Sequence, residues 1–168
     1  MESKINTHET DIQVNQPEVV MDTNRKEENQ IKLFMVDDDA VFLKLLEIEF
    51  LENADFKIET YSTGELCMEN ISNKPDVIIL DYHLDGVHRD AMNGLETLDQ
   101  IKAINPDIPV VMLSSQDRID DAINCMHHKA FDYVVKSETA FLRLKKIITS
   151  IFEHRKLEMQ LNWYVEQM

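Results

Sequence analysis

Three short apolar runs, each followed by an acid or a hydroxyl residue, constrain the fold of this chain more than any other feature. The runs are LFMV at 33–36, VIIL at 77–80 and VVML at 110–113, and the residues that follow them are Asp37, Asp81 and Ser114. A uniformly apolar run of this length is typical of a strand that is buried on both faces of a parallel sheet. The chain is therefore expected to form a parallel sheet covered by helices on both sides.

Segments with helical periodicity alternate with these strands. Further strands are predicted at 56–61 and 133–135, and helices at about 40–49, 64–71, 93–104, 118–128 and from 138 or 139 onward. Five alternations of strand and helix predict an α/β, doubly wound, five-stranded parallel sheet in the order 2-1-3-4-5, which is the flavodoxin-like fold. In the helix at 118–128, the side chains expected to face the core are Ile119, Ala122, Ile123 and Met126.

Composition limits the other classes of protein. A formal net charge of −15 over 168 residues argues against binding to nucleic acid or to an anionic membrane, because both need clustered Lys and Arg. Two separated cysteines, no apolar run of membrane-spanning length and no signal peptide indicate a cytoplasmic protein. We expect a disordered polar tail at 1–30, a domain at 31–155 and a C-terminal helical extension at 156–168.

The chemically unusual residues follow the predicted strands. Asp37 and Asp38 end the first strand, Asp81 the third, Ser114 the fourth and Lys136 the fifth. Since the carboxyl ends of parallel strands meet at one edge of a sheet, these side chains are expected to lie close together. Three carboxylates repel one another unless a cation joins them, and carboxylate oxygens suit Mg²⁺. A nearby ammonium and hydroxyl would suit a phosphoryl group.

Five motifs appear together in order. LFMVDDD, VIILDYHL, MNGLETL, PVVMLSS and FDYVVK resemble the receiver domain of two-component response regulators over roughly residues 31–155. The resemblance implies a phospho-accepting signalling protein rather than an enzyme that turns over small molecules. It also implies a sensor histidine kinase or phosphotransfer protein as donor and a downstream protein as target, while the net charge argues against direct contact with nucleic acid.

The resemblance also implies a role for each matching position. Asp81 would accept the phosphoryl group from a phosphohistidine. Mg²⁺ would be held by Asp37, Asp38, Asp81 and the backbone carbonyl of His83. Lys136 would pair with the phosphoryl group, while Ser114 and Tyr133 would move and shift a partner-binding surface. Asp39 is expected to cap a helix rather than to bind metal.

Two alternative functions are kept open. A degenerate receiver would act as a scaffold without phosphorylation. A phosphatase of the haloacid-dehalogenase type would use an aspartyl nucleophile, although its D-x-D motif follows the first strand, whereas Asp81 follows the third. The extension at 156–168 either packs on its own domain or forms a surface for a partner or a homodimer.

Three departures from the family pattern are visible. The loop after Asp81 is about five residues longer than usual and includes 84–91, Ser137 replaces a proline after Lys136, and Lys129 replaces a glycine. In the family, the bond after the lysine is often cis. A non-proline cis bond costs about 2.5–4 kcal/mol, so Ser137 implies either a trans bond with a shifted lysine or a strained backbone.

Overall fold

The sheet that the sequence predicts is present. The computed structural model describes residues 30–52, 55–84, 86 and 90–168. Its five strands form one parallel sheet in the order β2-β1-β3-β4-β5, which confirms the predicted fold class. The strands are β1 (Ile31–Val36), β2 (Phe56–Tyr61), β3 (Val77–Asp81), β4 (Val110–Ser114) and β5 (Asp132–Val135).

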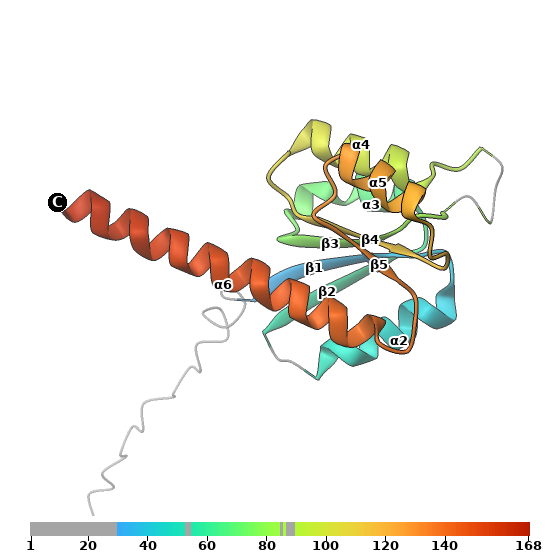
Figure 1. Cartoon of the computed structure of the whole chain (residues 1–168), viewed down its shortest axis with the longest axis horizontal. Coiled ribbons are helices and arrows are strands. Elements are labelled where there is room, and N and C mark those ends of the chain that lie inside the picture. The colour runs from blue at the N-terminus through green and yellow to red at the C-terminus, as the bar shows by residue number, and fades with distance from the viewer. Residues whose placement is uncertain (1–29, 53–54, 85, 87–89) are drawn as a thin grey trace, which may run out of the picture.

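Helices cover both faces of the sheet. Figure 1 shows α3, α4 and α5 on one face and α2 and α6 on the other. Their bounds are α2 (Ala40–Leu51), α3 (Gly64–Glu69) with the 3₁₀ turn η1 (Ile71–Asn73), α4 (Gly94–Ile104), α5 (Ile119–His127) and α6 (Ala140–Gln167). Because both faces are covered, every residue of β3 and β4 is buried.

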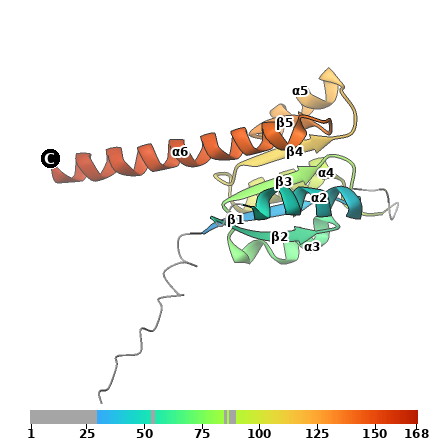
Figure 2. The same cartoon turned by 90° about the horizontal axis from the view of Figure 1, so that it is seen from below.

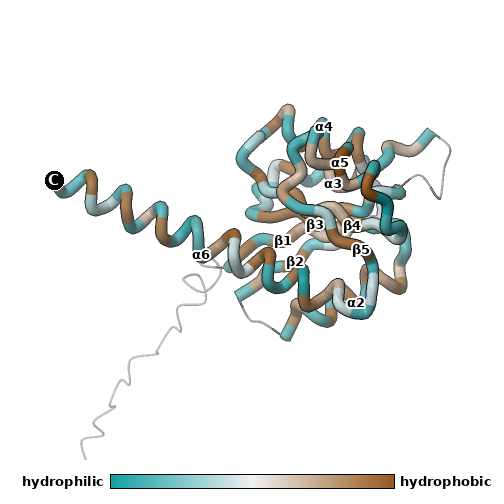
Figure 3. The backbone as a smooth tube through the Cα atoms, viewed as in Figure 1, coloured by the Kyte–Doolittle hydropathy of each residue, from teal (hydrophilic) through white to brown (hydrophobic). Residues whose placement is uncertain are grey.

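Alternate residues of each strand feed two separate hydrophobic clusters. Phe34 and Ile78 belong to the cluster beneath α3, α4 and α5, whereas Leu33 and Val77 belong to the cluster beneath α2 and α6. This division follows from the two-residue period of a strand, which sends successive side chains to opposite faces. Figure 3 shows the resulting band of hydrophobic residues along the central strands.

The inward face predicted for α5 is wrong in part. Ile119 is 77 % exposed, and Ile123 and Met126 are each 49 % exposed. Ala122 packs partly against the core, as predicted, and the buried residue of the helix is Cys125. A short helix needs only one narrow face to cover the edge of the sheet, so its remaining apolar residues lie on the surface.

Local interactions set two helix ends. Asp39 Oδ1 accepts hydrogen bonds from the backbone N–H groups of Val41 (3.0 Å) and Phe42 (3.1 Å), so Asp39 is the N-cap of α2, as expected. Lys129 follows the end of α5 with φ of 67°, in the left-handed region that favours glycine. This lysine therefore keeps the backbone turn that a glycine would make at its position.

The last helix continues without a break from Ala140 to Gln167. Ala140, Leu144, Ile148 and Ile151 are buried against the sheet, and the C-terminal part of the helix projects beyond the domain (Figures 1 and 2). Among the described residues, no helix is long and apolar enough to cross a bilayer. The division at 155 stays a prediction, and the predicted tail lies outside the described residues apart from Gln30.

Candidate functional site

Three carboxylates meet where β1 and β3 end. Asp37 and Asp38 follow β1, Asp81 is the last residue of β3, and β1 pairs directly with β3. One carboxylate oxygen from each of the three lies within 4.8 Å of the others. Asp37 and Asp81 are buried, at 1 % and 3 % exposure, while Asp38 is partly exposed. The predicted convergence of these acids is therefore present.

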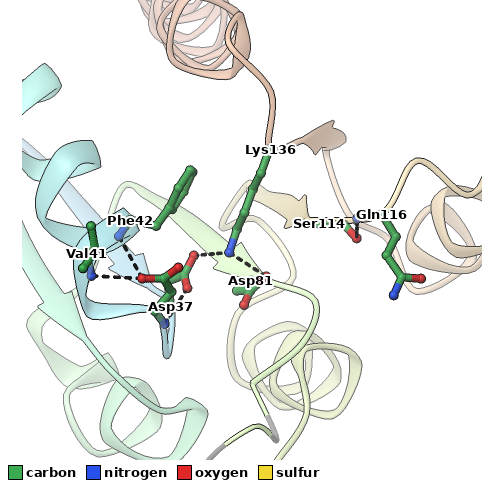
Figure 4. Close-up of polar contacts among 8 residues, drawn as sticks. Asp37, Val41, Phe42, Asp81, Ser114, Gln116 and Lys136 are labelled. Carbon is green, nitrogen blue, oxygen red and sulfur yellow. Dashed lines mark hydrogen bonds and ion pairs between the residues drawn. The ribbon is translucent and has the colours of Figure 1, made fainter.

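The Lys136 side chain reaches this cluster from the end of β5. Its Nζ lies 2.6 Å from Asp37 Oδ2 and 3.3 Å from Asp81 Oδ1 (Figure 4). The ammonium also lies 4.5 Å from the centre of the Phe42 ring, a cation–π distance. The Lys136–Ser137 peptide bond is trans. Lys136 therefore reaches both aspartates without a cis bond or a proline after it.

The electrostatics of the cluster leave an excess of negative charge. Burial, together with the charge of Asp37, raises the pKa of Asp81 to about 7, although Lys136 opposes the rise. Burial likewise raises the pKa of Asp37, against its contacts with Lys136. Burial opposes the charged form of Lys136, but its contacts with Asp37 and Asp81 prevail and raise its pKa. One lysine cannot balance three ionised acids, so the oxygen-only donor set fits a hard divalent cation.

The two predicted switch residues, Ser114 and Tyr133, both form hydrogen bonds with the backbone of Gln116. Ser114 is fully buried at the end of β4, and its Oγ accepts a hydrogen bond of 3.1 Å from Gln116 N–H (Figure 4). Tyr133 is buried in β5, and its hydroxyl donates a hydrogen bond of 2.8 Å to the Gln116 carbonyl. In this structure both hydroxyls therefore contact the Gln116 backbone.

The loop after Asp81 is anchored at its described positions. Leu84 is buried in the core, and Gly86 lies so close to Asp38 that a Cβ there would be 2.6 Å from Asp38 Oδ2. The Nε2 atom of His83 is buried without a hydrogen-bond partner, and the predicted metal contact of the His83 carbonyl stays a prediction. Residues 85 and 87–89 of the extra loop lie outside the described residues.

Sequence reasoning did not single out three residues that shape the site. Phe42 looked like an ordinary apolar helix residue, and Gln116 like a residue of a polar loop. Gly94 begins α4 against the backbone of Asp81 and Tyr82, where a Cβ would collide with the Asp81 carbonyl oxygen. Only Gly94 carried a usable signal, since a glycine at the start of a helix often marks a close approach of two backbones.

Fold and site together define a class of protein. The structure is a flavodoxin-like α/β domain with an acidic pocket, a lysine and hydroxyl residues at the carboxyl edge of its sheet. The family model for the response regulator receiver domain matches residues 33–149. The chain therefore belongs to the receiver domain family of two-component response regulators, as the sequence motifs implied.

Curated relatives resemble the chain over this same region. The transcriptional regulatory protein ZraR of Klebsiella oxytoca is 27 % identical over 128 residues, which cover 76 % of this chain and 28 % of ZraR. A protein-glutamate methylesterase/protein-glutamine glutaminase of Clostridium acetobutylicum is 35 % identical over 118 residues, or 67 % of this chain and 32 % of that enzyme. The chain thus spans less than a third of these relatives.

A solved structure supports the fold independently. The signal receiver domain of a putative LuxO repressor protein from Vibrio parahaemolyticus superposes with a TM-score of 0.68 at 24 % sequence identity. The match covers 79 % of this chain and 97 % of that domain. At this level of identity the likeness establishes the fold, and the function must be argued from the site.

Proposed function

We propose that Asp81 accepts a phosphoryl group from a phosphohistidine of a sensor histidine kinase or a phosphotransfer protein. The observation that carries this proposal is the Lys136 ammonium, which contacts Asp37 and Asp81 at once. A buried lysine held between two acids is placed to pair with a phosphoryl group on one of them while it stays close to the other. Membership of the receiver family supports the same role.

The proposed reaction is a phosphoryl transfer between two side chains. An Asp81 carboxylate oxygen attacks phosphorus, the N–P bond of phosphohistidine breaks, and the imidazole leaves with the bonding electron pair and takes up a proton. The product is an acyl phosphate on Asp81. We propose that Asp37, Asp38, Asp81 and the His83 carbonyl hold Mg²⁺, which supplies charge neutralisation at the phosphoryl oxygens.

The acyl phosphate would change contacts around the Gln116 backbone. The Ser114 hydroxyl hydrogen can be donated to a phosphoryl oxygen, and Tyr133 is tied to the same segment through the Gln116 carbonyl. We propose that these residues pass the change to the surface of α5, β5 and α6. The exposed Ile119, Ile123 and Met126 of α5 give that surface an apolar patch for a downstream protein.

We also propose a cytoplasmic location, which membership of the receiver family supports. The net charge of −15 argues against direct contact with nucleic acid. We propose slow loss of the phosphoryl group from Asp81 rather than turnover of small molecules.

Intact-mass measurement tests the phosphorylation directly. The chain is incubated with acetyl phosphate and Mg²⁺, and we expect one phosphate adduct per chain. Asp81→Asn should abolish the adduct, whereas Asp107→Asn, which lies before β4 at the opposite edge of the sheet, should leave it intact.

Two results would contradict the proposal. No adduct with acetyl phosphate or with a phosphorylated histidine kinase would favour a scaffold that acts without phosphorylation. Continuous release of phosphate from small phosphorylated molecules would favour the phosphatase alternative.

A further inference from the structure

The projecting part of α6 exposes many large apolar side chains to solvent. Ile151 is the last residue of α6 that is buried in the core. Beyond it, the large apolar side chains that are more than half exposed are Leu157, Met159, Leu161, Trp163, Tyr164, Val165 and Met168. A short helix is marginal in water without tertiary packing, so this segment is expected to be covered by another surface.

The exposed residues form a regular stripe. Leu157, Leu161, Tyr164 and Met168 are separated by four, three and four positions, which is the spacing of one side of a heptad repeat. Val165 lies next to this stripe. With 3.6 residues per turn, these side chains occupy one face of the helix. The stripe, defined by these five residues, has the pattern of a helix–helix seam.

The stripe begins where α6 leaves the domain. Nearer the domain, the same face carries Lys146, Ser150 and His154, which are all exposed. No charged side chain lies within the stripe itself. Gln160 and Gln167 on one side of it are neutral, and Glu158 on the other side has its Oε1 atom 3.2 Å from His154 Nε2. The change from polar to apolar residues on this face therefore comes after Ile151, the last residue of α6 that is buried in the core.

A different face of α6 turns towards the domain. Phe152, Met159 and Trp163 line a groove whose other wall includes Ile31 and Asp76. Arg155 bridges this region, since one guanidinium nitrogen lies 3.6 Å from Asp76 Oδ1 and another donates to the Asp76 carbonyl at 3.3 Å. Tyr164, at one edge of the stripe, also lines this groove, whereas Leu157, Leu161, Val165 and Met168 do not. These four residues of the stripe therefore lie on a face of α6 that the domain leaves uncovered.

We propose that the stripe pairs with the same stripe of a second copy of this chain. A two-fold axis brings identical apolar faces together, and a stripe without charges has no like-charge repulsion against its own copy. Each of its five side chains offers roughly 100 Å² of apolar area, or about 1,000 Å² for the pair. This total is at the lower limit for a specific interface, so the dimer is weak and forms in a concentration-dependent way.

Sedimentation equilibrium of the full chain tests the proposal. The weight-average mass should rise from monomer towards dimer over about 1–500 μM. Leu161→Glu should weaken association at least about 100-fold, because it buries two charges against apolar neighbours. Met159→Glu is the matched control: Met159 is 72 % exposed against 64 % for Leu161, but it faces the groove, so association should change less than about threefold.

A second substitution and a folding measurement distinguish loss of pairing from loss of folding. Leu157→Glu, a second substitution in the stripe, should repeat the effect of Leu161→Glu, and circular dichroism melts should show that all variants fold. A monomeric mass across the whole range would overturn the proposal. So would equal weakening by Met159→Glu and Leu161→Glu. Neither outcome bears on phosphorylation of Asp81, because the pairing uses α6 alone.

Discussion

The Lys136 ammonium lies 2.6 Å from Asp37 Oδ2, although β3 and β4 separate β5 from β1 in the sheet. The lysine side chain therefore crosses the carboxyl edge of two strands to reach the acid. Both partners are largely buried, with side-chain exposures of 14 % and 1 %. A buried ion pair of this kind is costly to break, because removal of one partner leaves the other charge without compensation.

Removal of the Lys136 charge should destabilise the metal-free protein. We expect Lys136→Met to lower the free energy of unfolding by about 3 kcal/mol at pH 7.5, since it leaves Asp37 and Asp81 uncompensated. Urea denaturation in the presence of a chelator measures the change. Lys145→Met is the control, because its ion pair with Glu49 (3.1 Å) is far more exposed, with side-chain exposures of 40 % and 42 %, and should contribute less than about 1 kcal/mol. Equal losses for the two variants would contradict the inferred importance of burial.

The pKa of Asp81 predicts how stability depends on pH. Because burial raises this pKa to about 7, above that of the unfolded chain, the folded state holds more protons at Asp81 between pH 4 and 7. Its contribution to metal-free stability is therefore complete below about pH 4 and is lost as the pH rises through 7.

Asp81→Asn should remove this dependence. We expect the melting temperature of the variant to exceed that of the wild type by roughly 5 °C at pH 8, with a much smaller gain at pH 5. Thermal melts with a chelator at both values test this difference. A gain that does not change with pH would show that Asp81 is ionised throughout the range.

Added Mg²⁺ should stabilise the folded chain through the three carboxylates. At a concentration about 100 times the dissociation constant, a ligand that binds only the folded state adds about 2.7 kcal/mol. The rise in melting temperature should be larger at pH 8 than at pH 5, because the acids must ionise to bind a metal. Asp38→Asn should reduce it strongly and Asp107→Asn should not. An unchanged response in Asp38→Asn would remove this residue from the metal site.

Lys129 holds a backbone conformation that glycine adopts more easily. With φ of 67°, the Cβ of Lys129 crowds the backbone, which costs roughly 1 kcal/mol. Lys129→Gly should therefore raise the free energy of unfolding by about that amount. Lys129→Ala is the control, since it removes the same charge but keeps the Cβ. Urea denaturation compares the two variants, and a similar gain from alanine would point to the charge instead of the backbone.

The sequence predicted the sheet order and the meeting of the acids for a simple reason. Uniformly apolar strands joined by helices have few topologies, and a parallel sheet places all strand ends at one edge. Asp37, Asp38, Asp81 and Lys136 therefore had to converge once the fold was correct. The cap at Asp39 is equally local, because it depends on hydrogen bonds to the next few residues.

The inward face of α5 could not be found in this way. Ile119, Ala122, Ile123 and Met126 have helical spacing, yet of these four only Ala122 packs against the core, and Cys125 is buried beside it. Periodicity locates an apolar stripe but does not tell whether the domain or another surface covers it. The same ambiguity holds for α6, because an exposed apolar stripe and a buried one look alike in sequence. Only the surface that packs against the stripe distinguishes them.

What the sequence determined by itself is the set of groups at the carboxyl edge, since strand pattern and residue type settle both their identity and their common position. Tertiary structure decided how those groups contact one another. The reach of Lys136 across β3 and β4, the Phe42 ring beneath it and the shared Gln116 backbone join segments that are distant in the chain. Burial at that edge then raises the pKa of Asp81, because desolvation depends on everything packed around a carboxylate and not on its neighbours in sequence.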